Sequence, residues 1–240
     1  MRTVLTVAVL AAALVATGPA GAATPKDPLA AYGYHLYGQY CLSCHGGDAE
    51  GTPGVAPSLH GVGALAADFY LRTGYMPLRH LGLQPRRQRV LLGDHQIKAL
   101  VAYVATFGGP PIPTPKPELG TLSKGLSLFT EHCAGCHQIT AQGGYVTGAV
   151  PPALVQATPR QVAQAVRIGP YVMPTFSQRA ISDRQLDSIV RYVEYTHAPA
   201  RPGGWGLGFL GPVPEGLVTW FVALPLLVGL CLLLGRRLRA

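Results

Sequence analysis

The chain has 240 residues, of which 48% are hydrophobic, and its formal net charge is +8. Once terminal segments are set aside, this length suits one or two domains. Half of this net charge lies at the two ends, since residues 25–215 carry only 15 minus 11, or +4. No basic run there alternates with aromatic residues, which argues against nucleic acid as a partner.

Residues 1–23 predict a secretory signal peptide. Arg2 precedes an apolar stretch from Val4 to Val15, and small residues then lead to Ala20-Gly21-Ala22. This stretch is shorter than a helix needs to cross a bilayer, so we expect cleavage near Ala22 or Ala23. A retained signal anchor is the alternative, and either arrangement exports the chain that follows.

A small helical domain is expected over residues 28–108. Its Cys41-Leu42-Ser43-Cys44-His45 motif follows a short helix, and an amphipathic helix closes the domain, with Asp94 as its expected N-cap. The first helix presents Gly33, Tyr34 and Tyr37 on an apolar face, and the closing helix has its i, i+3, i+4, i+7 stripe at Ile97, Leu100, Val101 and Val104.

Residues 109–119 predict a linker. Five prolines fall within the eight positions 110–117, and such a density favours extended polyproline II structure. We therefore expect a semi-rigid connection between two domains.

The second domain, residues 120–198, repeats the first. Cys133-Ala134-Gly135-Cys136-His137 lies 92 residues after the first motif (133 minus 41), and Ser182 or Asp183 is the expected N-cap of its closing helix. The repeated apolar positions are Gly125, Leu126 and Phe129 before the motif, and Leu186, Ile189, Val190 and Val193 in the closing helix. No strand pattern stands out, so both domains are predicted to be all-α.

The C-terminal part predicts a single membrane span. The stretch 199–215 is rich in glycine and proline and reads as a second linker, whereas residues 216–235 are uncharged and mostly apolar over the length that one helix needs to cross the hydrocarbon. Pro225 is tolerable in a lipid-embedded helix. Arginines within residues 236–240 mark the cytoplasmic side. The sequence thus predicts a cell-membrane protein, in contact with lipid, with its domains outside and its C-terminus in the cytoplasm.

Each Cys-x-x-Cys-His motif is typical of covalent c-type haem attachment. The two thiols form thioethers to the haem, and the histidine becomes an axial ligand of the iron. The motifs therefore predict two haems, held by Cys41, Cys44 and His45 and by Cys133, Cys136 and His137. Two disulfides or a four-thiol zinc site are the alternatives, and neither explains a histidine directly after each second cysteine.

Met76 and Met173 are candidates for the opposite axial ligands. Apart from Met1 they are the only methionines, and each lies between a haem motif and its closing helix, directly before a proline. Filling an apolar gap is the alternative role. A methionine opposite the histidine favours reduced iron and leaves no open site for a substrate, which suits electron transfer.

Pro57 and Pro152 are candidates to orient the ligand histidines. They lie 12 and 15 residues after His45 and His137, where a proline carbonyl could accept the second ring N–H of the histidine. An ordinary turn proline is the alternative. We assign no role to Cys231 or to His35, His60, His80, His95, His132 and His197, and we find no nucleophile with a base and no other catalytic constellation.

Each domain resembles the small cytochrome c fold. The matching features are the haem motif, a proline-x-leucine, the methionine and a closing helix that bears an aromatic residue. In that fold, a glycine of the first helix lets the closing helix cross closely beside an aromatic side chain. The pairs Gly33 with Tyr103 and Gly125 with Tyr192 are similar to this pattern.

The whole layout resembles the dihaem cytochrome c subunit of the actinobacterial-type cytochrome bcc complex (menaquinol:cytochrome c reductase). The most specific stretches are Gly203-Gly204-Trp205-Gly206-Leu207-Gly208 and Gly211-Pro212-Val213-Pro214-Glu215-Gly216, followed by Trp220. The segment from Arg72 to Leu78 also resembles that subunit's first methionine loop, but Tyr75 stands where a basic residue is expected.

The resemblance implies an electron-transfer subunit of a quinol-cytochrome c oxidoreductase, a translocase. One haem would take electrons from a Rieske iron-sulfur protein beside cytochrome b, and the other would pass them to a terminal cytochrome c oxidase. One alternative is a membrane-anchored dihaem carrier that serves another oxidase or reductase. A dihaem peroxidase is a second, and the two methionines at matching places argue against it.

Overall fold

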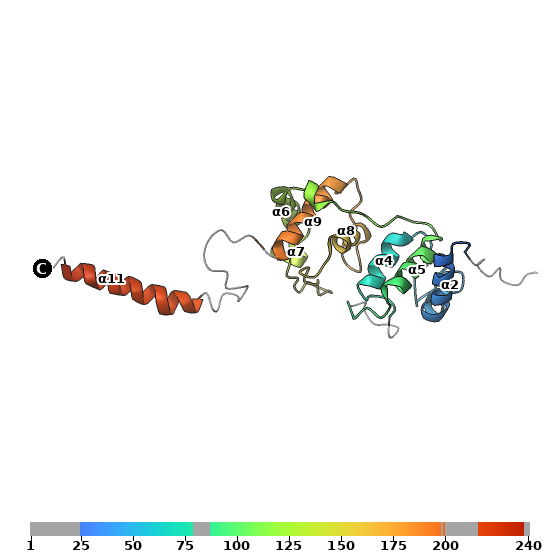
Figure 1. Ribbon diagram of the computed structural model, residues 1–240, viewed down its shortest axis with the longest axis horizontal. Helices are drawn as coiled ribbons and strands as arrows, with labels where there is room; N and C mark the ends of the chain where they lie inside the picture. Colours follow the sequence, from blue (N-terminus) through green and yellow to red (C-terminus); the bar gives the residue numbers. More distant parts are fainter. Residues whose placement is uncertain (1–24, 79–86, 198, 200–215, 238–240) are drawn as a thin grey trace, which may run out of the picture. The chain divides into compact units, whose positions relative to one another are not determined.

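The computed structural model describes residues 25–78, 87–197, 199 and 216–237, and Figure 1 shows it as a ribbon. Every regular element in these ranges is helical, which confirms the all-α prediction; the only β pairings there are the isolated bridges Thr52–Ala56 and Val146–Ala149. The first domain contains α2 (Pro28–Tyr40), α3 (Leu42–His45), α4 (Gly63–Arg72) and α5 (Asp94–Ala105), and the second contains α6 (Leu122–His132), α7 (Ala134–His137), α8 (Pro159–Ile168) and α9 (Asp183–His197).

In each domain the first helix crosses the last: α2 lies against α5, and α6 against α9 (Figure 1). A Cβ added at Gly33 would overlap the carbonyl oxygen of Ala99 and lie 2.8 Å from Cβ of Tyr103. Gly125 has the same surroundings, formed by the Ser188 carbonyl and by Tyr192. Both glycines therefore serve the close helix crossing that the resemblance to the cytochrome c fold implied.

The apolar stripes of the closing helices are buried as predicted. Ile97, Leu100, Val101 and Val104 belong to the core of the first domain, and Leu186, Ile189, Val190 and Val193 to that of the second. On α6 the prediction is wrong for Leu126, which is 40% exposed. One residue after Gly125 is a rotation of about 100° around the helix, so the buried positions beside that glycine are Leu128 and Phe129.

Two helices, α4 and α8, were not among the predicted elements. Thr158 and Gln161 form a reciprocal capping box at the start of α8, and Gly169 ends it in the left-handed conformation. α4 packs on α5, and α8 packs on α9. α4 also contacts α8, where Nε2 of the fully buried Gln164 donates to Oδ2 of Asp68 at 2.8 Å.

The closing helices begin on different caps. The N-cap of α5 is Gly93, so the prediction of Asp94 as the cap is wrong by one residue, and Asp94 is the first helical residue. In that place its carboxylate interacts favourably with the positive end of the helix dipole. At α9, Ser182 Oγ accepts from the backbone N–H of Gln185 at 3.3 Å, which makes Ser182 the cap.

The proline-rich linker has no helix up to Lys116, but residues Pro117–Leu119 form a 3₁₀ turn instead of continuing an extended chain. The linker is bound at both ends. The Pro110 carbonyl accepts from the backbone N–H of Leu65 at 3.2 Å, and the backbone N–H of Lys116 donates to Asp187 Oδ1 at 2.7 Å.

The C-terminal unit contains one helix over Gly216–Arg237, the only described helix long and apolar enough to cross a membrane. It runs two residues beyond the predicted 216–235. A π-helical turn over Thr219–Ala223 precedes α11 (Leu224–Arg237). Pro225 lacks an N–H and its ring would clash with an α-helical carbonyl one turn earlier, so the wider turn accommodates it. The predicted signal peptide, residues 200–215 of the second linker and residues 238–240 of the tail lie outside the described residues.

Candidate haem-binding sites

Each Cys-x-x-Cys-His motif forms one helical turn. The backbone N–H of His45 donates to the Cys41 carbonyl at 2.9 Å, and that of His137 to the Cys133 carbonyl at 2.9 Å. Each histidine therefore lies one turn beyond the first cysteine, on the same side of the chain. Burial raises the pKa of the Cys41 and Cys133 thiols to about 11.

The part of the chain that the structure describes contains neither of the alternative cysteine sites, the two disulfides or the four-thiol zinc site. All five cysteines are free thiols, and within the described residues no group of three or more His, Cys, Asp or Glu side chains could hold a metal ion. The four motif cysteines thus form neither two disulfides nor a shared four-thiol centre.

Both motif histidines contact a proline carbonyl. His45 Nδ1 lies 2.9 Å from the Pro57 oxygen, and His137 Nδ1 lies 3.1 Å from the Pro152 oxygen. A carbonyl oxygen can only accept, so Nδ1 carries the hydrogen, and in the neutral ring Nε2 keeps a free lone pair. Burial lowers the pKa of His137, with the Pro152 bond acting in the opposite direction.

Two glycines that the sequence patterns did not single out allow the proline carbonyl to lie close to the motif histidine. Gly51 and Gly143 each lie six residues after the motif histidine (51 minus 45 and 143 minus 137) and have φ values of 84° and 75°. A Cβ at Gly51 would lie 2.5 Å from the Pro57 carbonyl carbon, and one at Gly143 would lie 2.7 Å from that of Pro152. The two share the 92-residue offset of the motifs, and this signal could have identified them.

The two methionines lie in loops that follow α4 and α8. The backbone N–H of Met76 donates to the Tyr70 carbonyl at 3.1 Å, and that of Met173 to the Pro170 carbonyl at 3.1 Å. The Met76–Pro77 peptide bond is cis. Met76 packs on the core that also receives Cys41, and Met173 on the core that receives Cys133. Each domain thus brings its cysteine motif and its methionine to one core.

A tyrosine hydroxyl fastens the segment that follows each motif. In the first domain, Tyr37 of α2 donates to the Gly46 carbonyl at 2.7 Å. In the second, Tyr192 of α9 donates to the Ile139 carbonyl at 2.6 Å. The donor therefore comes from the first helix in one domain and from the closing helix in the other.

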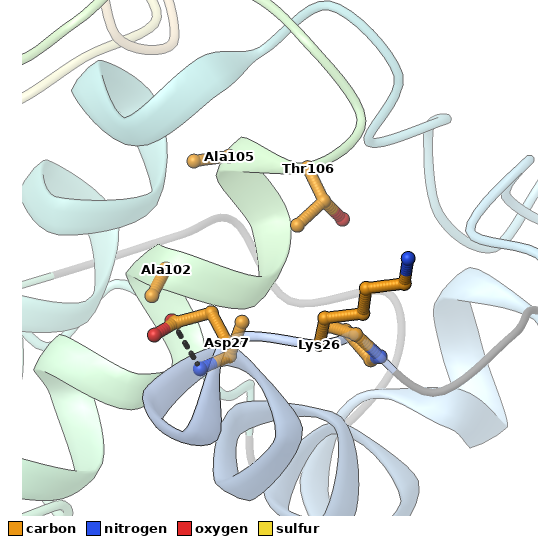
Figure 2. A pocket seen from close by; sticks show the side chains of 7 residues that line it. Lys26, Asp27, Ala102, Ala105 and Thr106 are labelled. Atoms are coloured by element: carbon orange, nitrogen blue, oxygen red, sulfur yellow. Dashed lines mark hydrogen bonds between the residues drawn. The ribbon is translucent and has the colours of Figure 1, made fainter.

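A shallow hollow at the start of α2 is a different feature. Figure 2 shows Lys26 and Asp27 on one side of it, and Ala102 and Ala105 of α5 with its C-cap Thr106 on the other. The Asp27 carboxylate accepts from the backbone N–H of Ala30 at 2.9 Å and so caps α2. No motif residue lines this hollow, which is therefore separate from the haem sites.

The donor set fits c-type haem twice over. Each domain supplies two thiols and a histidine in one helical turn, a histidine Nε2 left free by the proline contact, and a thioether on the same core. Sulfur and imidazole are the donors that such iron takes in electron-transfer cytochromes.

Comparison with known proteins agrees with this geometry. A family model described as cytochrome c oxidase, cbb3-type, subunit III, matches residues 28–104 and again residues 120–193. Fold and site together define a cytochrome c with two tandem domains.

Curated relatives narrow the class. The chain is 35% identical to the cytochrome bc1 complex cytochrome c subunit of Mycobacterium tuberculosis (strain ATCC 25618 / H37Rv), over 96% of this chain and 90% of that protein. It is 34% identical to the subunit of that name from Corynebacterium diphtheriae, over 85% and 80%. A cbb3-type cytochrome c oxidase subunit CcoP from Azospirillum sp. is 28% identical over 67% and 60%. The chain belongs to the family of cytochrome c subunits of actinobacterial cytochrome bc1 complexes.

Proposed function

We propose that this chain passes electrons from a Rieske iron-sulfur protein, which works beside cytochrome b, through two His/Met haems to a terminal cytochrome c oxidase. The observation that supports this most is the duplication of one complete donor set, each copy with its histidine on a proline carbonyl at 2.9 or 3.1 Å. Relatives named as cytochrome bc1 complex cytochrome c subunits support the assembly.

The residues divide the work as follows. Cys41 and Cys44, like Cys133 and Cys136, would supply the thioether sulfurs. His45 and His137 would offer Nε2 to the iron, oriented by Pro57 and Pro152. Met76 and Met173 would offer their thioether sulfurs to the same iron and so exclude water and oxygen from it. One-electron transfer is the chemistry that the iron supplies when haem is bound.

In this proposal, the helix Gly216–Arg237 anchors the protein in the cell membrane, with Arg236 and Arg237 at the cytoplasmic side and both haem domains outside. A chain cut after Pro214 should then be exported, retain both haems and leave the membrane, because the described residues hold no second span. Truncated protein that stays in washed membranes would favour a retained N-terminal anchor or tight partner binding.

Replacing the methionines tests the ligand assignment. Met76→His and Met173→His should each lower the potential of one haem, because imidazole stabilises oxidised iron better than a thioether does. Redox titration with optical detection measures both haems of the full chain, so the unchanged domain is the internal control. Electron flow should slow in both variants, since each electron visits the two haems in series. Unchanged potentials in Met76→His would refute the ligand of the first domain.

A second candidate function is service to a different oxidase, and the matched cbb3-type subunit III model favours it. Purification of the native complex separates the two functions. Cytochrome b and a Rieske protein should co-purify with this chain, whereas their absence beside an oxidase core would support the second candidate.

A further inference from the structure

Each candidate methionine lies between two helices that an arginine–aspartate pair joins. Met76 lies between α4 and α5, and Met173 lies in the loop Gly169–Ser182, between α8 and α9. An arginine, Arg72 or Arg167, stands at or next to the end of the helix before each methionine, and an aspartate, Asp94 or Asp183, is the first residue of the helix after it.

In the second domain, the arginine binds both the far helix and the loop itself. Arg167 Nη2 donates to Asp183 Oδ1 at 2.7 Å, and its Nη1 donates to the carbonyl oxygens of Phe176 and Ile181 at 3.1 and 2.8 Å. The Arg167 side chain is only 11% exposed. One guanidinium thus fixes three points that follow Met173 in the chain.

In the first domain, the arginine is anchored on a buried carboxylate and joins α4 to α5. Arg72 Nε donates to Asp68 Oδ1 at 2.6 Å, and Arg72 Nη1 donates to Asp94 Oδ1 at 2.8 Å. The Asp68 side chain is 3% exposed, so the guanidinium is anchored before it spans to α5.

We propose that Arg167–Asp183 is a positioning pair that holds the Met173 loop closed, so that the Met173 thioether stays on its haem iron, and that Arg72–Asp94 positions Met76 by fixing the end of α4 to the start of α5. The inference rests on the proposed methionine ligands. A flexible loop loses entropy when its ends are joined and gains freedom when they part. The planar guanidinium suits this role because it makes several fixed bonds at once.

The test measures how often the sixth iron position opens. Carbon monoxide binds ferrous haem only after the methionine leaves, so its binding to the reduced full-length protein reports loop opening. Arg167→Gln should increase the rate of carbon monoxide binding about tenfold or more, because one charge-assisted bond is worth roughly that factor or above in an equilibrium. The amplitude should correspond to one haem per chain, and the potential of that haem should fall.

Matched variants separate positioning from general stability. Asp183→Asn removes the charge pair but leaves the two carbonyl bonds of Arg167, so we expect a smaller increase in the rate of carbon monoxide binding. If the Arg167→Gln protein fails to take up haem, this variant provides the test. Arg72→Gln should act on the first haem alone. Arg160→Gln removes an exposed charge from α8, and Lys98→Gln removes the 2.7 Å Lys98–Asp94 pair but leaves the Arg72–Asp94 bond. Both controls should behave like the parent protein.

The outcomes are distinguishable. If the arginine variants lose thermal stability but keep the parent's carbon monoxide binding and potentials, the positioning role is wrong. If they do so while Met173→His still lowers one potential, the ligand assignment stands and only this inference fails. If the methionine variants leave both potentials unchanged, the proposed ligands fail first.

Discussion

The two haem domains share a geometry but differ in some of the hydrogen bonds that maintain it. The segment after the first motif is held by Tyr37 from the opening helix, whereas the segment after the second is held by Tyr192 from the closing helix. The counterpart of Tyr37 is Phe129, which has no hydroxyl, and the counterpart of Tyr192 is Tyr103, whose buried hydroxyl finds no partner among the described residues. One carbonyl must be satisfied in each domain, and either helix can supply the donor.

The arginine contacts near the two methionines differ in the same sense. Arg167 binds two carbonyl oxygens within its loop as well as Asp183, whereas Arg72 binds the carboxylates of Asp68 and Asp94. The arginine contacts of the second domain therefore involve mainly uncharged acceptors, and those of the first are ion pairs. This difference makes the domains separately testable.

The largest effect should be common to both domains. Gly33→Ala and Gly125→Ala place a methyl group on the backbone carbonyl of the crossing helix, which cannot move aside without separating the helices. Each should cost about 1–3 kcal/mol of unfolding free energy, the usual range for overpacking, or somewhat more. Denaturant unfolding of the haem-loaded chain measures it.

Gly38→Ala is the matched control on α2, since a Cβ there meets nothing within 4 Å. It should leave stability unchanged or raise it by up to about 1 kcal/mol through helix propensity. A Gly33→Ala protein as stable as Gly38→Ala would show that the crossing is looser than the structure has it.

The next largest effect on stability should differ between the two domains. Tyr192→Phe removes a 2.6 Å hydrogen bond and should cost about 0.5–1.5 kcal/mol. Tyr103→Phe, at the equivalent place, removes a buried hydroxyl without a described partner and should be neutral or slightly stabilising. Thermal unfolding of the two variants gives the comparison, and Tyr37→Phe should resemble Tyr192→Phe. Equal losses at Tyr103 and Tyr192 would contradict the assignment of different donors.

Sequence reasoning succeeded where the residue types and the spacing of the repeat indicate the same structure. The all-α class and the buried stripes of the closing helices follow from spacing that occurs in both repeats, and the crossing glycines follow from the resemblance to the cytochrome c fold. The predicted proline contacts to His45 and His137 are present in the geometry. The helix α8 was missed, although Thr158, Pro159 and Gln161 form a recognisable start signal.

The arginine pairs were out of reach for a different reason. Arg167 follows Arg72 by 95 residues, whereas Asp183 follows Asp94 by 89 (167 minus 72 and 183 minus 94). Neither matches the 92-residue offset of the haem motifs, because more residues separate the motif from the arginine in the second domain and fewer separate the arginine from the aspartate. The aligned closing helices already place Asp94 and Asp183 at equivalent positions, but only the folded chain pairs each aspartate with its arginine. The sequence also does not reveal that the hydroxyl donor is Tyr37 in the first domain and Tyr192 in the second, since this depends on three-dimensional contacts.

The smallest effect should be a loss of stability at acidic pH, mainly in the first domain. Hydrogen bonds from Lys98 and then from Arg72 lower the pKa of the Asp94 carboxyl. A lowered pKa in the folded chain means that the contribution of this group is complete above the unfolded value, about 4, and is lost as the pH falls through the lower folded value. Asp94 is exposed, so solvent and salt keep the effect small.

This acid response can be isolated by comparing the parent protein with Asp94→Asn. The stability difference between them should be present at neutral pH, shrink below about pH 4 and diminish with added salt. Lys98→Gln, which leaves the 2.8 Å Arg72 bond in place, should retain part of it. The two carbonyl bonds of Arg167 do not titrate, so the second domain keeps these loop contacts over the same range. If the difference between parent and Asp94→Asn stayed constant down to pH 3, about one unit below the unfolded pKa of an aspartate, the ion pair would not be its source.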